Sequence, residues 1–189
     1  MSDGNDNPAF SRRAVPGDDL ERMVCDRCGW IHYENPKIIV GSVVEVTDES
    51  GLSQVMLCRR AIEPRRGFWT IPAGFMEEHE TTEQGARREA REEACADIEV
   101  RDLLAIYSIP RISQVQLIYR ARLARPEFSA GPESLEVRLF SWDEIPWGEL
   151  AFPSVHWALH HFAEARDRAV IAPFTNPAGE LGNRLPQGL

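Results

Sequence analysis

Residues 74–96 read GFMEEHETTEQGARREAREEACA, and the interpretation of the whole chain depends on this stretch. Its second half predicts a helix over about residues 82–94, because Thr81 suits an N-cap and Gln84 stands at the capping-box position three residues later. Alanines at positions 86, 90 and 94 form a small-residue stripe along this helix. Such a stripe would let the helix lie close against a sheet.

Three glutamates crowd one face of the predicted helix. At about 100° per residue, Glu89, Glu92 and Glu93 point in nearly the same direction. A like-charged pair at i, i+4 costs about 0.2–0.5 kcal/mol on a surface helix. One explanation is a solvated acidic face. The other is a site for a hard divalent cation such as Mg²⁺ or Mn²⁺, which takes oxygen ligands and would neutralise the repulsion.

The segment before the helix favours the cation, because its proline and glycine, Pro72 and Gly74, can bend the chain back over a metal site. Gly74 is followed by five residues and Glu80, then by seven residues and the run REAREE at 88–93. This arrangement resembles the Nudix box, G-x5-E-x7-R-E-U-x-E-E-x-G-U, where U is aliphatic. Every charged position is filled, and the one departure is Cys95 in place of the second glycine, which usually ends the helix in a left-handed turn.

The resemblance implies an α/β fold of the Nudix type, a mixed β-sheet sandwiched between helices. It also implies a Mg²⁺- or Mn²⁺-dependent hydrolase that cleaves the diphosphate linkage of a nucleoside diphosphate derivative. The residues that correspond to its metal ligands are Glu89, Glu92, Glu93, the carbonyl of Gly74 and, before the helix, Glu80. Those expected to act in catalysis are Glu93, Glu92 and Arg88.

The remaining sequence fits such a domain over residues 37–170. Alternating or β-rich runs predict strands at 37–46, 54–60, 98–109, 114–123 and 136–142. The first two of these strands are expected to pair as a hairpin. An amphipathic pattern predicts a second helix over 154–168. Residues 171–189 are rich in Pro, Gly and Asn and are expected to form a loose tail.

Residues 1–36 form an N-terminal extension with half of a zinc ribbon. The motif CDRCG supplies Cys25 and Cys28, whereas a structural zinc site usually has four ligands. His32 is a candidate third ligand, and no cysteine precedes Cys25. We therefore expect a degenerate ribbon without zinc; the alternative is a zinc ion with unexpected or intersubunit ligands.

The candidate substrate-binding residues lie mainly between the hairpin and the box. The chain resembles a Nudix subgroup that includes ADP-ribose, FAD and NADH pyrophosphatases, but it lacks the S-Q-P-W-P-F-P-x-S array of the NADH enzymes. ADP-ribose or FAD is therefore the expected substrate. The candidate phosphate contacts, which could instead be solvated side chains, are Arg59, Arg60, Arg65 and Arg66. Phe68 and Trp69 could stack a base or pack in the core. A late carboxylate that could complete the site or lie on the surface is offered by Glu133 and Glu136.

Composition limits the other functions. The chain has 189 residues, 43% of them hydrophobic, and a formal net charge of −9, which argues against a duplex nucleic-acid binder. No apolar run approaches the ~20 residues of a membrane span, and the N-terminus lacks the apolar core of a signal peptide. With four cysteines we expect a cytoplasmic protein with reduced thiols. The resemblance suggests a homodimer acting on a small nucleotide; the alternatives are an NADH or NAD-cap pyrophosphatase and a non-catalytic ligand sensor.

Overall fold

The computed structural model describes residues 9–47, 51–169 and 171–185, and the chain divides into two compact units, Met1–Pro36 and Lys37–Leu189. The smaller unit is an antiparallel sheet in the order β1-β2-β3. Its strands are β1 (Phe10–Ala14), β2 (Glu21–Cys25) and β3 (Ile31–His32).

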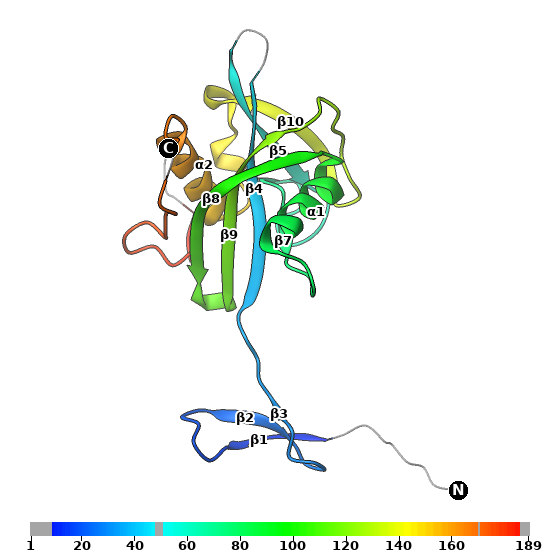
Figure 1. Ribbon diagram of the computed structural model, residues 1–189, viewed down its shortest axis with the longest axis vertical. Coiled ribbons are helices and arrows are strands. Elements are labelled where there is room, and N and C mark those ends of the chain that lie inside the picture. The colour runs from blue at the N-terminus through cyan, green and yellow to red at the C-terminus, as the bar shows by residue number, and fades with distance from the viewer. Residues whose placement is uncertain (1–8, 48–50, 170, 186–189) are drawn as a thin grey trace, which may run out of the picture. The chain divides into compact units, whose positions relative to one another are not determined.

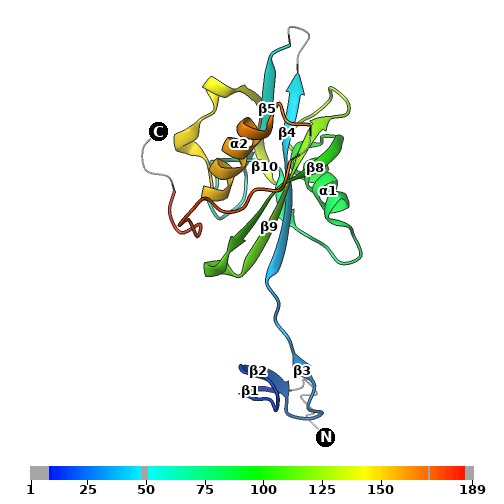
Figure 2. The ribbon, with the colours of Figure 1, turned by 60° about the vertical axis from the view of Figure 1, so that its left-hand side comes forward.

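The larger unit is a mixed sheet with α1 and α2 on opposite faces (Figures 1 and 2). This is the predicted architecture. Its elements in chain order are β4 (Lys37–Thr47), β5 (Ser53–Arg60), β6 (Trp69–Thr70), β7 (Ala73–Phe75), α1 (Thr82–Ala94), β8 (Ile98–Ile109), η1 (Pro110–Ile112), β9 (Gln114–Leu123), β10 (Ser134–Ser141), η2 (Trp142–Glu144), η3 (Trp147–Glu149) and α2 (Pro153–Ala165).

The strands follow the order β10-β5-β4-β9-β8. The β4–β9 pair is parallel and the other pairs are antiparallel, so the sheet is mixed. The predicted strands at 98–109 and 114–123 have the observed bounds, and β4 and β5 do pair as a hairpin. The second helix ends at Ala165, three residues before the predicted end.

The sheet opens between β4 and β5. The two strands pair only over Glu45–Thr47, and farther back along β4 the residues Ile39–Gly41 pair with the short strand β7 instead. The strand β6 in turn pairs with the end of β5. The segment that carries β6 and β7 therefore lies where β4 and β5 separate, and side chains from both faces of the sheet can meet there.

Each helix covers one core. The alanine stripe of α1 is fully buried, with Ala90 and Ala94 in a cluster with Val44, Met56 and Ala121. Gly85 also permits a close approach, because a Cβ there would lie 2.7 Å from a methyl group of Val40. The apolar face of α2 packs on the other side of the sheet, in a cluster that contains Leu104, Tyr107 and Ile118.

The segment after α2 is attached to the sheet at two points, unlike the loose tail expected from its composition. Phe174 forms an isolated bridge with Ala105 in β8, and its ring stacks on His161 at 4.3 Å. The Asn176 side chain accepts from the N–H of Ser108 and donates to the Ser108 carbonyl. None of the described helices is long and apolar enough to cross a membrane.

Candidate active site

The helix α1 begins and ends where the sequence predicts. Thr81 is the N-cap, and both hydrogen bonds of the capping box with Gln84 are present. At the other end Cys95 adopts the left-handed conformation, with φ 47°, and its N–H caps carbonyls of the last turn. Cysteine thus provides the turn for which the pattern specifies glycine, and the helix that carries Glu89, Glu92 and Glu93 is capped at both ends.

Strand β7 brings the chain against two of these glutamates. The N–H of Ala73 donates a hydrogen bond of 3.0 Å to Oε2 of Glu93. Next to it, a Cβ on Gly74 would overlap the carboxylate of Glu89. A glycine is therefore required at position 74 because the acid of the helix lies directly against the backbone.

Arg88 is surrounded by the carboxylates of Glu80, Glu89 and Glu92. It donates to Glu80 through two nitrogens at 2.8 and 3.1 Å, to Glu89 at 2.7 Å and to Glu92 at 2.9 Å. It also donates to the carbonyl of Phe75. Hydrogen bonding to Glu80 is the main reason that the pKa of Arg88 is raised. Arg88 therefore orients Glu89 and ties the loop before the helix to it.

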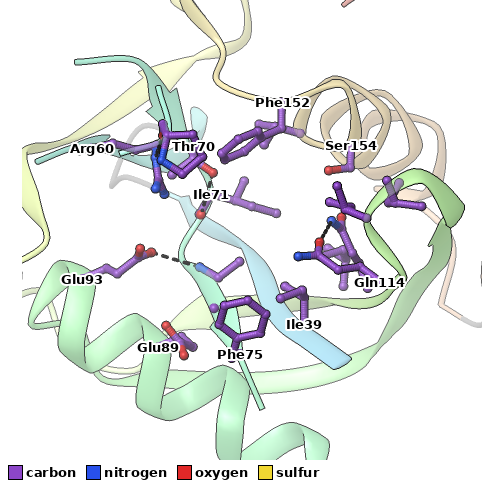
Figure 3. Close-up of a pocket in the computed structure, with 18 of the residues that line it drawn as sticks. Ile39, Arg60, Thr70, Ile71, Phe75, Glu89, Glu93, Gln114, Phe152 and Ser154 are labelled. Carbon is purple, nitrogen blue, oxygen red and sulfur yellow. Dashed lines mark hydrogen bonds between the residues drawn. The ribbon is translucent and has the colours of Figure 1, made fainter. Parts of the chain in front are cut away.

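A cavity of about 500 Å³ lies at the opening of the sheet (Figure 3). The carboxylates of Glu89, Glu92 and Glu93 face it from α1, and Arg60 faces it from the end of β5. The opposite wall contains Phe152 and Ser154 near the start of α2, with Gln114 and Gln116 on β9. Its volume is in the range of small-molecule sites.

Burial sets the electrostatics of the acidic side of the cavity. Desolvation is the largest cause that raises the pKa of Glu93, to about 8, and the neighbouring charge of Glu89 adds to it. Burial likewise raises the pKa of Glu89, although the hydrogen bond from Arg88 opposes the shift. Two buried acids that resist ionisation side by side are a favourable place for a cation.

The loop before β10 adds a further acid. Glu133 lines the cavity and its charge raises the pKa of both Glu89 and Glu93. The loop is held by N–H groups of Ser129 and Gly131, which donate to the last carbonyls of α1 at Ala94 and Glu93. The expected late carboxylate is thus brought to the site at position 133, while Glu136 is not.

Most of the candidate substrate-binding residues lie outside the cavity. Arg59 donates to the Gly67 carbonyl and lies 3.9 Å from Glu136, and Arg65 stacks on Phe68 at 3.8 Å. Arg66 is exposed. The cavity is lined neither by Arg66 nor by the pairs Arg59–Glu136 and Arg65–Phe68. Trp69 is buried in the core, with its ring edge-on to Phe140.

Side chains alternate along a strand, which explains this division. Because Arg59 and Arg60 are adjacent in β5, they point to opposite faces, and only Arg60 faces the cavity. Gln114 and Gln116 were not anticipated as lining residues. Their signal was present as two polar side chains at i, i+2 of a predicted strand, which places both on one face of β9.

The donor set on α1 fits a hard divalent cation. Among the described residues no three Cys, His, Asp or Glu side chains are gathered into a ready-made metal site. The positive charge between the glutamates is that of Arg88. However, Glu89 and Glu93 present buried carboxylates to the cavity, Glu92 is an adjacent exposed acid, and the backbone of Gly74 lies directly against the Glu89 carboxylate. Glu80 does not line the cavity and is engaged by Arg88.

The N-terminal unit carries the two cysteines that the sequence offers as zinc ligands. Cys25 and Cys28 form the expected knuckle, in which the Gly29 N–H donates to the Cys25 carbonyl, and both thiols are free. The ring of His32 contacts Trp30 at 5.5 Å, and no third ligand joins the two cysteines within the described part of the unit.

Polar contacts connect β1 to the turn that carries Cys25 and Asp26. The Ser11 hydroxyl donates to Asp26 at 2.6 Å, and Arg13 donates to the Cys25 carbonyl. The N–H of Asp26 donates in turn to the carbonyl of Ala9, so that β1 is fixed to the knuckle.

Comparisons with known proteins agree with this geometry. The NUDIX domain model matches residues 37–175, and the Nudix N-terminal model, a zinc ribbon, matches residues 8–34. A NUDIX hydrolase from Nitrosomonas europaea of known crystal structure is 46% identical, with a TM-score of 0.82 over 91% of this chain and 96% of that one.

Two curated relatives have named activities. The ADP-ribose pyrophosphatase of Methanocaldococcus jannaschii is 28% identical over 147 residues, which are 76% of this chain and 79% of that protein. The NAD-capped RNA hydrolase NudC of Stutzerimonas stutzeri is 32% identical over 125 residues, or 66% of this chain. The match spans only 43% of NudC.

Proposed function

Because the chain belongs to the Nudix hydrolases, we propose that it hydrolyses the diphosphate linkage of a nucleoside diphosphate derivative, with ADP-ribose or FAD as the preferred substrate. The observation that carries this proposal is the pair of buried carboxylates, Glu89 and Glu93, at the wall of a cavity large enough for a nucleotide. The relationship to an ADP-ribose pyrophosphatase supports the choice of substrate class.

We propose that Glu89, Glu92 and Glu93, with the carbonyl of Gly74, hold Mg²⁺ or Mn²⁺. A divalent cation supplies Lewis-acid stabilisation of phosphoryl oxygens and lowers the pKa of water at the site. Glu80 acts indirectly in this assignment, because it binds Arg88, which in turn orients Glu89.

The side chains around the cavity have separate tasks. Glu93 is fixed by Ala73 and is the candidate to accept or hold the proton of the attacking water. Glu133 faces the same space from the loop before β10 and adds a further acid. The wall with Phe152 and Gln114 would receive the part of the substrate beyond the diphosphate and exclude water from it.

The relationship to NudC favours a second candidate, an NADH or NAD-cap pyrophosphatase. The first experiment therefore compares kcat/KM for ADP-ribose, FAD and NADH with Mg²⁺ and with EDTA. We expect Mg²⁺-dependent cleavage with ADP-ribose or FAD above NADH. A clear preference for NADH would favour the second candidate, and no hydrolysis with any compound would favour a ligand sensor.

Two further properties are proposed on the sequence alone. A cytoplasmic location agrees with the four cysteines, all free in the structure. A homodimer is suggested by the resemblance to the pyrophosphatase subgroup, and its mass in solution is measured by light scattering.

A further inference from the structure

Arg60 is a buried cation without a carboxylate partner. Its exposed fraction is 9%, and no carboxylate lies within 4.0 Å of it in the part of the chain that the structure describes. Its Nε donates to the carbonyl of Pro64 at 2.9 Å, and the guanidinium lies over the ring of Phe152 at 5.2 Å. Buried arginines are ordinarily paired with an anion, so this arrangement is incomplete.

Arg120 shows how the same fold completes a buried guanidinium. It is 3% exposed and forms two hydrogen bonds of 2.6 Å with the carboxylate of Asp102. A third nitrogen donates to the carbonyls of Ala165 and Arg168. Every nitrogen of Arg120 is therefore satisfied by the protein, whereas only Nε of Arg60 has a hydrogen-bond acceptor in the described structure.

The unpaired end of Arg60 faces the candidate active site. Arg60 lines the cavity, and Figure 3 shows its guanidinium directed toward the side that carries Glu93. The charge of Arg60 lowers the pKa of Glu93, but no hydrogen bond or ion pair within 4.0 Å joins these two side chains in the described structure, and Oε2 of Glu93 is bound by the N–H of Ala73. The position is enclosed by Phe152 and Thr70, which also line the cavity.

We propose that Arg60 binds the diphosphate of the substrate, with its terminal nitrogens donating to oxygens of one phosphoryl group across the cavity from the glutamates of α1. The planar guanidinium suits this role because it can donate two parallel hydrogen bonds to one phosphate. Its contact with Phe152 and its bond to Pro64 fix the plane before the substrate arrives. Arg60 is thus a binding and positioning residue for the substrate.

This inference rests on the proposed function and makes the diphosphate the recognised group. An anion that pairs with Arg60 must bind in the cavity, and the acids that would hold a cation line the same cavity. A phosphoryl group between Arg60 and such a cation would be neutralised from both sides. The acidic chain with its net charge of −9 can bind a polyanion only through such a local arrangement.

The test measures binding without turnover, using α,β-methylene-ADP, whose bridging carbon prevents cleavage between the two phosphorus atoms. Isothermal titration in Mg²⁺ compares the wild-type protein with Arg60→Met and with Arg122→Met as control. Arg122 lies on β9, is 63% exposed and pairs with Glu99 away from the cavity. We expect the Kd of Arg60→Met to rise roughly 10–100-fold, because charge-assisted hydrogen bonds are lost, and that of the control to stay unchanged.

Thermal unfolding of the free proteins separates binding from a structural role. Since the protein itself satisfies only Nε of Arg60, Arg60→Met should melt within a few degrees of the wild type. Arg120→Met is the buried arginine for comparison and should melt much lower. A Kd within twofold of wild type, or a melting temperature as low as that of Arg120→Met, would overturn the assignment.

If Arg60→Met does not fold, Arg60→Lys decides the question. It keeps the charge and loses the planar fork, so we expect weaker binding of α,β-methylene-ADP in a folded protein. Unchanged affinity would count against Arg60. If the wild type hydrolyses the substrate and the Arg60 variants bind α,β-methylene-ADP normally, only this inference is contradicted. If the wild type neither binds nor cleaves any diphosphate, the proposed function is contradicted.

Discussion

Glu93, on the last turn of α1, accepts a hydrogen bond of 3.0 Å from the N–H of Ala73, twenty positions earlier in β7. This contact joins the loop and the helix of the box at the edge of the cavity. It leaves the second carboxylate oxygen of Glu93 free for another partner. The position of this acid is therefore set by the backbone before any ligand binds.

The first prediction concerns the role of Glu93 in turnover. Glu93→Gln preserves the shape of the side chain but removes its charge and its capacity to accept a proton. We expect kcat to fall by about 10²–10⁴-fold if Glu93 assists proton transfer. Steady-state kinetics with ADP-ribose and Mg²⁺ checks this, and Arg122→Met serves as an exposed control. Full activity in Glu93→Gln would mean that the helix is misassigned.

The second prediction concerns stability of the metal-free protein. Burial raises the pKa of Glu93 to about 8, above its ordinary value of 4.5. A raised pKa gives stability that is complete below the unfolded-state value and is lost as the pH rises through 8. In EDTA the wild type should thus lose stability between pH 5 and pH 8.5 relative to Glu93→Gln, as measured by urea unfolding. Parallel pH curves for the two proteins would contradict the shift.

The third prediction concerns the glycine beside Glu89. In Gly74→Ala the new Cβ overlaps the Glu89 carboxylate, so the acid or the strand must move. We expect a destabilisation of about 1–3 kcal/mol, typical of overpacking, and a large loss of turnover. Gly148→Ala is the matched control, because its Cβ would meet nothing within 4 Å. Equal melting temperatures and activities in the two variants would refute the close contact.

The fourth prediction concerns the ion pair between the buried Arg120 and the partly exposed Asp102. Asp102→Ala leaves Arg120 buried without its anion, which should destabilise the protein by about 3 kcal/mol. Glu99→Ala breaks the exposed pair with Arg122 and should cost about 1 kcal/mol or less. Urea unfolding of both variants measures the difference. Similar costs would show that solvent reaches the Asp102–Arg120 pair.

The fifth prediction concerns zinc. Cys25 and Cys28 are the two cysteines of the knuckle, and the contacts of Ser11 and Arg13 already connect its strands. Protein purified without added metal should therefore contain well below one zinc per chain by elemental analysis, and Cys28→Ser should not change that content. One tightly held zinc per chain would require ligands from elsewhere, with His32 examined first.

The box and several individual strands could be predicted because they are local patterns. The capping box at Thr81 and the spacing of the glutamates depend on residues a few positions apart, and the strands at 98–109 and 114–123 depend on alternation. The choice between the neighbouring arginines at positions 59 and 60 could not be made in this way. Arg59 and Arg60 are equivalent in composition, and only the pairing of β5 with β6 and β10 determines which of them faces inward.

The left-handed residue at the end of α1 has a consequence for how such motifs are written. Cys95 occupies the position for which the pattern specifies glycine, yet it adopts φ 47° with its side chain exposed. The position requires a backbone conformation rather than the absence of a side chain. A search pattern that insists on glycine there would exclude this chain, although its helix ends in the same geometry. At positions defined by φ, a side chain that points to solvent costs the strain of the left-handed backbone but meets no clash, whereas at Gly74, which is defined by contact, a side chain would overlap Glu89.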